Sequence, residues 1–490
     1  MESQYLRALE AGVRDIGAPK SGVKTRLTTP QSQGASTLDS TTDYLDVLSR
    51  FASDTTLSDI AADVRSRCCV IIADTLAVIA AGMQEPEMKA LAANHLSGAG
   101  PGHASVIGTF KRCNPLDAAL LNATAGVWLE LDEGNFSTNG HPGIHVIPAA
   151  LAHAQHRAVS GADFLCAVVL GYEVCGRIGG AYQMKTIVQP HGTYGVIGAA
   201  IAVARMRGFT VAQMREVINV AASTPMGGNR QTMIDGATVR NYYAGHGNFT
   251  GPMAARLVQS GFTGPRDAPS VTYGQLLADH FDCAQTIAGL GHDWTLPRGY
   301  IKLYPSGRYV HSAIDALLDA LRKSPGARLD PESVERVEVR GYKMVAYLGE
   351  QRPPTLFGTR FSVPYSVAAI VWHGRTDLEI FGVDSFTNES IMELATRVHV
   401  SEEPAFTAEF HAKQKVELTI WLKNGKTLSG RCEITKGESA NPHSAEDIQK
   451  KFYQLARPVW GEPLARTVHE LCMQVETISD LREAFADLAL

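Results

Sequence analysis

Small apolar residues dominate the first half of the chain and recur at the spacing expected of buried helices. Between about residue 44 and residue 256, runs such as 149–152 and 198–202 consist of alanine, glycine, leucine and isoleucine. Small side chains let helix axes approach closely, so the pattern predicts helices that bury one another. We expect helices to begin after two capping boxes, at Ser160 and Thr210, and to end near Gly171 and Gly208.

After about residue 300 the spacing of apolar residues changes from helical to alternating. Apolar residues alternate with mostly polar ones around 337–339 and over 416–422, which predicts strands with one buried face. Asn424-Gly425 separates the second run from 427–435, a strong signal for a β-hairpin. Two helices are expected between these strands, at 362–373 and 389–397.

These patterns predict a mostly α protein, in which a large, discontinuous all-helical domain is combined with a smaller α+β lid domain. Residues 1–40 are expected to form a flexible N-terminal extension, since residues 28–42 are rich in Ser, Thr, Gln and Gly. The expected domains are 41–298 for the first part of the helical domain and 299–437 for the lid. Residues 438–490 should form helices, at 445–455 and 462–488, that return to the helical domain.

Composition excludes several classes of protein. The 490 residues include 45 Lys and Arg and 50 Asp and Glu, a net charge of −5 that gives no footprint for nucleic acid. No stretch of about 18 uncharged apolar residues is present, which predicts no membrane span. Eight cysteines without a CxxC pair suit reduced thiols in a cytoplasmic protein and exclude common zinc-ribbon and iron–sulfur spacings.

The densest polar cluster lies in a Gly- and Asn-rich loop between two apolar segments. It holds three carboxylates and two histidines: Glu130, Asp132, Glu133, His141 and His145. Buried charge is costly unless it is paired or used, so this loop is the first candidate for an active site. The alternative is a surface loop whose acids face water.

The same loop raises the possibility of a metal site. His141 and His145 have the i, i+4 spacing of helical metal ligands, but Pro142 and Gly143 weaken a helix there and no HExxH motif is present. A metal-dependent hydrolase built on Glu130 and Asp132 with these histidines is therefore the less favoured alternative, and we expect no metal.

Four further segments carry single candidate residues. His191 precedes a small-residue helix, whose N-terminus would keep it neutral, as a general base must be. Arg240 and Lys302 could bind a substrate carboxylate, and Tyr365 could donate a hydrogen bond. Taken singly, each has a structural alternative: a satisfied histidine, a surface cation or a core aromatic residue.

Six segments in order resemble the MmgE/PrpD family over about residues 44–488. They are the acidic loop ending at His141-Pro142, His191-Gly192-Thr193, 239–245, 301–305, 361–374, and Asn441-Pro442-His-Ser444 with Lys451-Phe452. The family includes iron–sulfur-independent 2-methylcitrate dehydratases, cis-aconitate decarboxylases and iminodisuccinate epimerases. The resemblance implies a helical domain and a lid with the active site between them, a homodimer, and no obligatory cofactor.

The resemblance also implies which residues act. Glu130 and Asp132 match acidic active-site positions, His141 and His191 match two histidines, and Lys302 and Tyr365 match a lid-side Lys and Tyr. Arg240 stands where many members have Lys; His145 and Glu133 are added as substrate-binding candidates. The family's substrates are small di- or tricarboxylates, and its reactions pass through a carbanion or enolate beside a carboxylate.

The first hypothesis is therefore a cofactor-independent hydro-lyase, with the histidines transferring protons and Lys302 and Arg240 holding substrate carboxylates. An epimerase or a decarboxylase using the same pocket is the alternative, and a non-catalytic protein that keeps the scaffold is a further one. Dehydratase and decarboxylase members usually read Asp-Phe-Asn/Asp-Asp-Thr-Trp where this chain reads Glu-Leu-Asp-Glu-Gly-Asn. This departure favours a substrate other than 2-methylcitrate or cis-aconitate.

Overall fold

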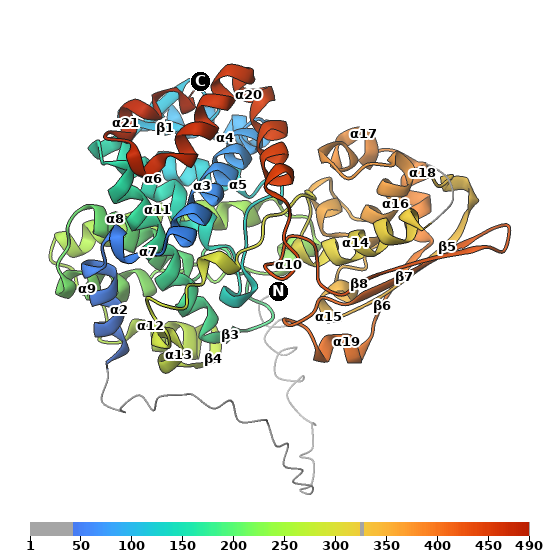
Figure 1. Cartoon of the computed structure of the whole chain (residues 1–490), viewed down its shortest axis with the longest axis horizontal. Coiled ribbons are helices and arrows are strands. Elements are labelled where there is room, and N and C mark those ends of the chain that lie inside the picture. The colour runs from blue at the N-terminus through green and yellow to red at the C-terminus, as the bar shows by residue number, and fades with distance from the viewer. Residues whose placement is uncertain (1–42, 324–327, 490) are drawn as a thin grey trace, which may run out of the picture. The chain divides into compact units, whose positions relative to one another are not determined.

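The computed structural model describes residues 43–323 and 328–489, in which helices predominate and the sheets are few and small (Figure 1). The expected fold class, mostly α with a smaller α+β region, is confirmed. The predicted N-terminal extension, residues 1–40, lies outside the described residues. The exact domain limits stay predictions, but two hydrophobic cores are distinct.

The larger core is built by helices from both ends of the described chain, here called the helical part. Its longer members are α2 (Tyr44–Asp54), α3 (Ala62–Gly82), α4 (Pro86–Leu96), α5 (Pro115–Gly126), α6 (Pro142–Arg157), α7 (Gly161–Gly180), α8 (Gly195–Met206), α9 (Val211–Ala222) and α11 (Val239–Gln259). Shorter segments include α10 (Gln231–Ile234), α12 (Ala268–Val271) and α13 (Cys283–Ile287), and two small antiparallel pairs, β1 (Ala104–Val106) with β2 (Lys111–Cys113) and β3 (Tyr182–Met184) with β4 (Ala278–Phe281).

Close helix packing explains one wrong prediction. Gly171 was expected to end a helix, but α7 runs through it to Gly180. A Cβ atom on Gly171 would lie 2.6 Å from the carbonyl oxygen of Gly198 in α8, so the glycine serves close approach of two helices. The other expected boundaries are confirmed: Ser160 and Thr210 cap α7 and α9, and Gly208, at φ +69°, follows the end of α8.

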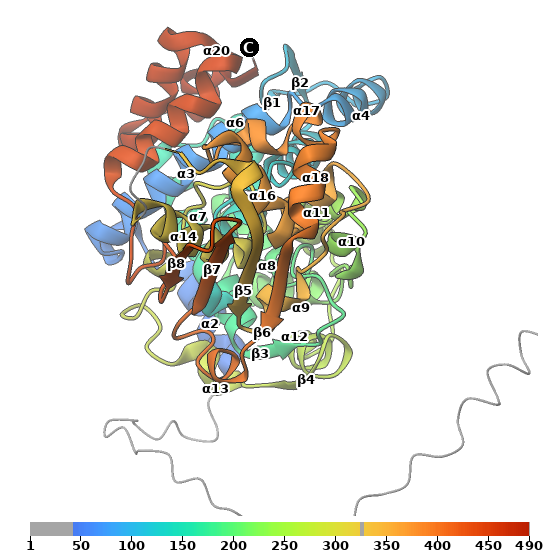
Figure 2. The same cartoon turned by 90° about the vertical axis from the view of Figure 1, so that its right-hand side faces the viewer.

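The smaller core surrounds a four-stranded sheet, here called with its helices the α/β part. The strands β5 (Val334–Gly341), β6 (Val398–Glu402), β7 (Val416–Leu422) and β8 (Thr427–Cys432) lie in the order β6-β5-β7-β8. Only β5 and β6 run parallel (Figure 2). The predicted hairpin is confirmed, with Gly425 at φ +80° between β7 and β8, although β8 ends three residues earlier than expected.

Helices α14 (Arg308–Arg322), α16 (Val363–His373), α17 (Val383–Phe386) and α18 (Glu389–Thr396) lie together beside this sheet, and the short α15 (Lys343–Tyr347) and α19 (Pro404–Ala408) lie near its other side (Figure 1). The buried residues of β5 and β7 alternate with exposed or half-buried ones along most of each strand. This alternation buries one face of the sheet against α14 and α16.

The C-terminal segment packs back on the helical part. Helix α20 (Ala445–Met473) bends at Gly461, whose φ is +70°, and places Phe452, Trp460 and Val468 in the larger core. A last helix was predicted over 462–488, but it ends at Met473. A short α21 (Leu481–Ala484) follows, because Asp480 caps a new helix there.

The eight cysteines are all free. Within the described residues, no single helix is both long and apolar enough to cross a membrane. Helices α3 and α4 meet that test only when taken together, across a bend of 89°.

Candidate active site

The N-terminal ends of three helices meet at the acidic loop. His141 is the residue before α6, His191 lies four residues before α8, and Arg240 is the second residue of α11. The acidic loop follows α5 and approaches them from the other side. Helix N-termini carry unpaired N–H groups and partial positive charge, so this junction favours anions.

Glu130 has a strained backbone and a fully engaged carboxylate. It is 1% exposed, and its φ of +53° lies in the left-handed region that residues other than glycine rarely adopt. Its carboxylate forms an ion pair with Arg240 and lies 3.4 Å from Nζ of Lys302. The two cations therefore hold the loop in this conformation.

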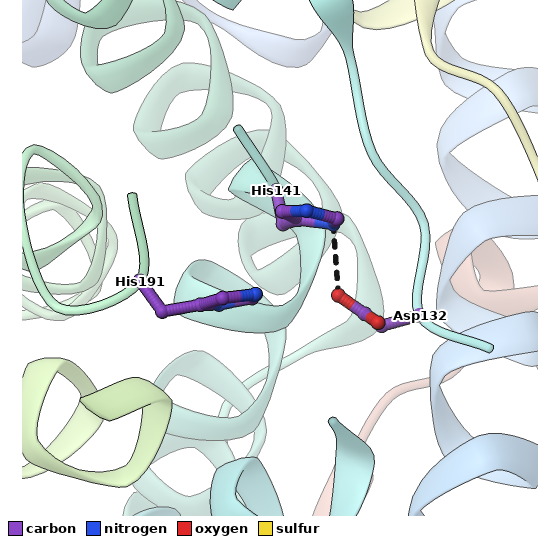
Figure 3. Close-up of side chains that lie close together, drawn as sticks. All are labelled: Asp132, His141 and His191. Carbon is purple, nitrogen blue, oxygen red and sulfur yellow. Dashed lines mark ion pairs between the residues drawn. The ribbon is translucent and has the colours of Figure 1, made fainter. Parts of the chain in front are cut away.

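Asp132 links Lys302 to His141. One carboxylate oxygen lies 3.1 Å from the Lys302 ammonium, and the other lies 2.9 Å from Nδ1 of His141 (Figure 3). Burial raises the pKa of Asp132, but Lys302 and His141 more than offset it, so the pKa lies well below its usual range. Asp132 is therefore a carboxylate in this site.

His141 has a defined tautomer. Its Nδ1 lies 2.8 Å from the backbone carbonyl oxygen of Glu133 as well as 2.9 Å from Asp132. Both neighbours are acceptors, so Nδ1 carries a hydrogen and Nε2 is left to exchange a proton. The side chain is 13% exposed, which makes it accessible to a ligand.

His191 stacks on His141 and is supported by His145. The His141 and His191 rings lie 4.5 Å apart at 20°, and Nδ1 of His191 lies 3.3 Å from Nε2 of His145. Burial, with Arg240 and His141 nearby, places the pKa of His191 well below its usual range, and burial lowers that of His145 to about 3. His145 was predicted to bind substrate; the structure places it behind His191, and it does not line the cavity.

Glu133, the other residue predicted to bind substrate, does not line the cavity either. Its carboxylate accepts hydrogen bonds from the Tyr172 hydroxyl at 2.6 Å and the Gly143 amide at 3.0 Å. Burial raises its pKa to about 7 although these bonds lower it. Glu133 therefore fixes the start of α6, because Gly143 is its second residue.

Tyr365 is not placed in the site either. Its hydroxyl donates to the backbone carbonyl of Ile380 at 2.8 Å, and its ring lies in the smaller core beside Phe381. The structural alternative, a core aromatic residue at a helix start, is the one that the structure supports.

A cavity of about 200 Å³ opens between the helical part and the α/β part at this junction. Of the predicted residues, Glu130, His141 and Arg240 line it, whereas Asp132, His191 and Lys302 lie behind them. Sequence reasoning missed several other lining residues: Asn135, Phe136, Gln189, Arg230, Tyr300, Arg308, Tyr309, Phe361, Phe410 and His411. Arg230 and Arg308 adjoin segments that the sequence had marked, which was the available signal.

Arg230 and Arg308 differ in how their charge is used. Arg308 pairs with the carboxylate of Glu438 and lies over the Tyr300 ring. Arg230 is half-buried and donates from Nε to the carbonyl of Val188 at 3.1 Å, with no acidic partner among residues 43–323 and 328–489. Arg230 is therefore the cation in the cavity wall whose charge is available.

Lys451 is a further residue that sequence reasoning did not assign. Its ammonium donates to the carbonyl of Leu131 at 2.8 Å and lies 2.6 Å from the buried carboxylate of Asp74. Leu131 separates Glu130 from Asp132, so helix α20 supports the acidic loop from behind.

A candidate group for metal binding is formed by Asp132, His141 and His191. Each offers one ligand atom, and these atoms lie within 4.8 Å of one another. The Lys302 ammonium, 3.1 Å from Asp132, competes with a cation for that carboxylate. This set keeps Asp132 and His141 of the predicted set and has His191 in place of Glu130 and His145.

The fold and the site together define a class: a two-part, mainly helical enzyme that presents histidine, carboxylate and cationic side chains to one cavity. Two family models match the chain, the MmgE/PrpD N-terminal domain over residues 46–281 and the MmgE/PrpD C-terminal domain over residues 304–476. The chain belongs to the MmgE/PrpD family.

Curated relatives support a lyase of the dehydratase or decarboxylase type. Cis-aconitate decarboxylase of Aspergillus terreus is 23% identical over 457 residues, 88% of this chain and 93% of the relative. Cis-aconitate decarboxylase-like protein oryM of Aspergillus oryzae is 26% identical over 88% of this chain and 94% of its own. The human cis-aconitate decarboxylase is 25% identical over 76% of this chain and 78% of its own.

Proposed function

We propose that the protein is a cofactor-independent lyase that acts on a small di- or tricarboxylate and transfers a proton at a carbon beside a carboxylate. The observation that carries this proposal is His141, whose Nδ1 is held by Asp132 and by the Glu133 carbonyl while its ring lines the cavity. An imidazole held in one orientation with Nε2 towards the cavity is suited to general acid–base catalysis. Loss of water is the favoured outcome.

The proton transfer needs a histidine that can gain and lose charge. As Nε2 of His141 takes a proton from the substrate carbon, the Asp132 carboxylate beside Nδ1 stabilises the imidazolium, which then gives the proton to the departing hydroxyl so that water leaves. His191, stacked on the same ring and kept neutral by burial, adds no opposing charge. His191 therefore supports His141 rather than reaching the substrate itself, which revises its predicted role.

The substrate class follows from the cations. Arg230 and Arg240 line the cavity, and a guanidinium binds a carboxylate through two parallel hydrogen bonds. The three helix N-termini add partial positive charge that stabilises an enolate as it forms. Lys302 acts indirectly. Its ammonium pairs with the carboxylates of Glu130 and Asp132, whereas it was expected to bind a substrate carboxylate.

A positive group beside Asp132 also bears on the metal-dependent alternative. The Lys302 ammonium places a positive charge beside Asp132, where a divalent ion would otherwise supply one. We therefore keep a reaction without metal as the proposal, with hydrolysis at a metal bound by Asp132, His141 and His191 as the competing one.

Loss of CO₂ is the second candidate, because the curated relatives named above are cis-aconitate decarboxylases or resemble one. Decarboxylation breaks the bond to CO₂ and leaves a carbanion, to which a protonated His141 would deliver its proton, the reverse of the proton abstraction in dehydration. Epimerisation would use it without net loss of either small molecule.

Proton NMR in D₂O tests the proposal with metal-stripped protein and a panel of citrate, 2-methylcitrate, cis-aconitate, malate-type acids and iminodisuccinate. Loss of water or CO₂ from one compound would support the lyase and name its substrate. Deuterium exchange at an α-carbon without other change would identify an epimerase. Activity that returns only when metal is restored would favour the metal-dependent enzyme.

A homodimer is also proposed, on the family resemblance alone, and so is a cytoplasmic location. Analytical ultracentrifugation of the full chain would test the dimer directly: a species near 105 kDa is expected, twice the chain mass of 52.7 kDa.

A further inference from the structure

Three helices begin at the active site, and a second cavity lies at their C-terminal ends. Helices α6, α8 and α11 start beside His141, His191 and Arg240, and their last residues reach a surface pocket of about 300 Å³. Its charged and polar lining consists of His153, His156, Arg157, Arg207, Arg256 and Gln259. At 1.5 Å per residue, the 16 residues of α6 separate the two cavities by about 24 Å.

No acidic side chain among residues 43–323 and 328–489 balances the positive charge of this pocket. Arg157, Arg207 and Arg256 form no ion pair with any carboxylate in the part of the chain that the structure describes. Burial, and then the nearby Arg256 and Arg157, lowers the pKa of Arg207, as expected for a cation beside other cations.

The helix ends reduce this charge only in part. Each helix C-terminus carries about half an elementary negative charge, so three ends offset about half of three guanidinium charges. The N-terminus of α5, at Pro115 and Leu116, contributes charge of the opposite sign to the same pocket. Neutralising helix dipoles therefore does not account for the whole cluster.

A buried polar atom points to a ligand independently of the arginines. His153 lines the pocket and is only 8% exposed, and its Nε2 has no hydrogen-bond partner in residues 43–323 and 328–489. Buried polar side chains are normally paired, so an unpaired one that borders a cavity requires explanation. Burial, and then Arg207, lowers the pKa of His153 to about 3, so the ring is neutral and can donate one N–H.

We propose that this pocket is a second ligand site, which binds a phosphate group carried by a small molecule. The three guanidinium groups would share the phosphate oxygens through charge-assisted hydrogen bonds, and His153 would donate to one of them. The site is separate from the catalytic cavity and does not depend on the proposed reaction.

Calorimetric titration of the full chain with inorganic phosphate at low ionic strength tests this site. Wild type should bind phosphate saturably at one site per chain. The double variant Arg157→Gln/Arg256→Gln should bind at least tenfold more weakly, and since both side chains are exposed its thermal midpoint should stay near that of wild type.

Two controls separate this site from general charge and from the catalytic cavity. Arg50→Gln/Arg266→Gln removes two exposed arginines outside the pocket and should bind phosphate as wild type does. Arg230→Gln, which alters the catalytic cavity, should also leave phosphate binding unchanged. Absence of binding to wild type, or binding that survives in Arg157→Gln/Arg256→Gln, would overturn the proposal, as would loss of binding in Arg230→Gln.

Discussion

The ammonium of Lys302 lies 3.1 Å from the carboxylate of Asp132, and the two residues are 170 positions apart in the sequence. Glu130 and Arg240 complete a buried cluster of two acids and two cations. Its formal charges cancel, which is the condition under which buried charge is tolerated. The cluster joins the acidic loop to α11 and to the segment that leads into α14.

Lys302→Met should therefore destabilise the fold strongly. It leaves two buried carboxylates with one cation, and breaking a buried ion pair in this way costs about 3–5 kcal/mol. The measurement is the free energy of unfolding in urea. Lys323→Met is the matched control, because its exposed ammonium pairs with Asp319 at the surface and should matter by less than about 1 kcal/mol. Equal effects of the two substitutions would contradict the role of Lys302.

Lys451 is predicted to position the acidic loop. Lys451→Met should lower both stability and kcat, because the Leu131 carbonyl loses its donor and Asp74 loses its cation. In Asp74→Leu/Lys451→Met no buried charge is left unpaired, so much of the stability should return while kcat stays about tenfold low or lower. Recovery of kcat together with stability would show that Lys451 is only structural.

The raised pKa of Glu133 predicts that the stability of the fold decreases as the pH rises. Its pKa rises from 4.5 to about 7 on folding, so the folded state binds the proton more tightly. This contribution to stability is complete below about pH 4.5 and is lost as the pH rises through about 7. Compared with Glu133→Gln, wild type should lose unfolding free energy over that window, measured by urea titration at several pH values. A difference that is constant with pH would contradict the assignment.

Arg230→Gln tests whether the unpaired guanidinium in the cavity wall binds a substrate carboxylate. Hydrogen bonds to charged groups contribute about 1.5–3 kcal/mol, so KM for the carboxylate substrate should rise about 10- to 100-fold with a smaller change in kcat. Arg298→Gln, an exposed arginine paired with Asp293, should change neither. An unchanged KM in Arg230→Gln would show that the substrate carboxylates are held elsewhere.

The sequence predicted the fold class because local patterns carry it. The alternation in 416–422 and the Asn424-Gly425 turn are properties of neighbouring residues, and both are confirmed. The predictions that a helix ends at Gly171 and that the last helix covers 462–488 were wrong for a different reason. The contact of Gly171 with α8 and the cap at Asp480 depend on packing partners that periodicity does not reveal.

The sequence predicted which types of residue form the site, but not which of them line the cavity and which lie behind it. The carboxylates and histidines of the loop were found because buried charge is rare, yet sequence spacing does not tell which of them face a cavity. His145 contacts His191, and the Glu133 carboxylate accepts a hydrogen bond from the Gly143 amide at the start of α6. The Tyr365 hydroxyl donates to the carbonyl of Ile380. Arg230 was missed although it precedes a marked segment, because a single arginine in a glycine-rich loop has no distinguishing pattern of its own.

The most direct test of the central claim compares wild type with His141→Gln in the D₂O NMR panel. The account predicts that wild type removes water or CO₂ from one carboxylic acid, and that His141→Gln is at least 100-fold slower while its thermal midpoint stays close to that of wild type. Turnover by His141→Gln at the wild-type rate would contradict the proposal that this histidine moves the proton.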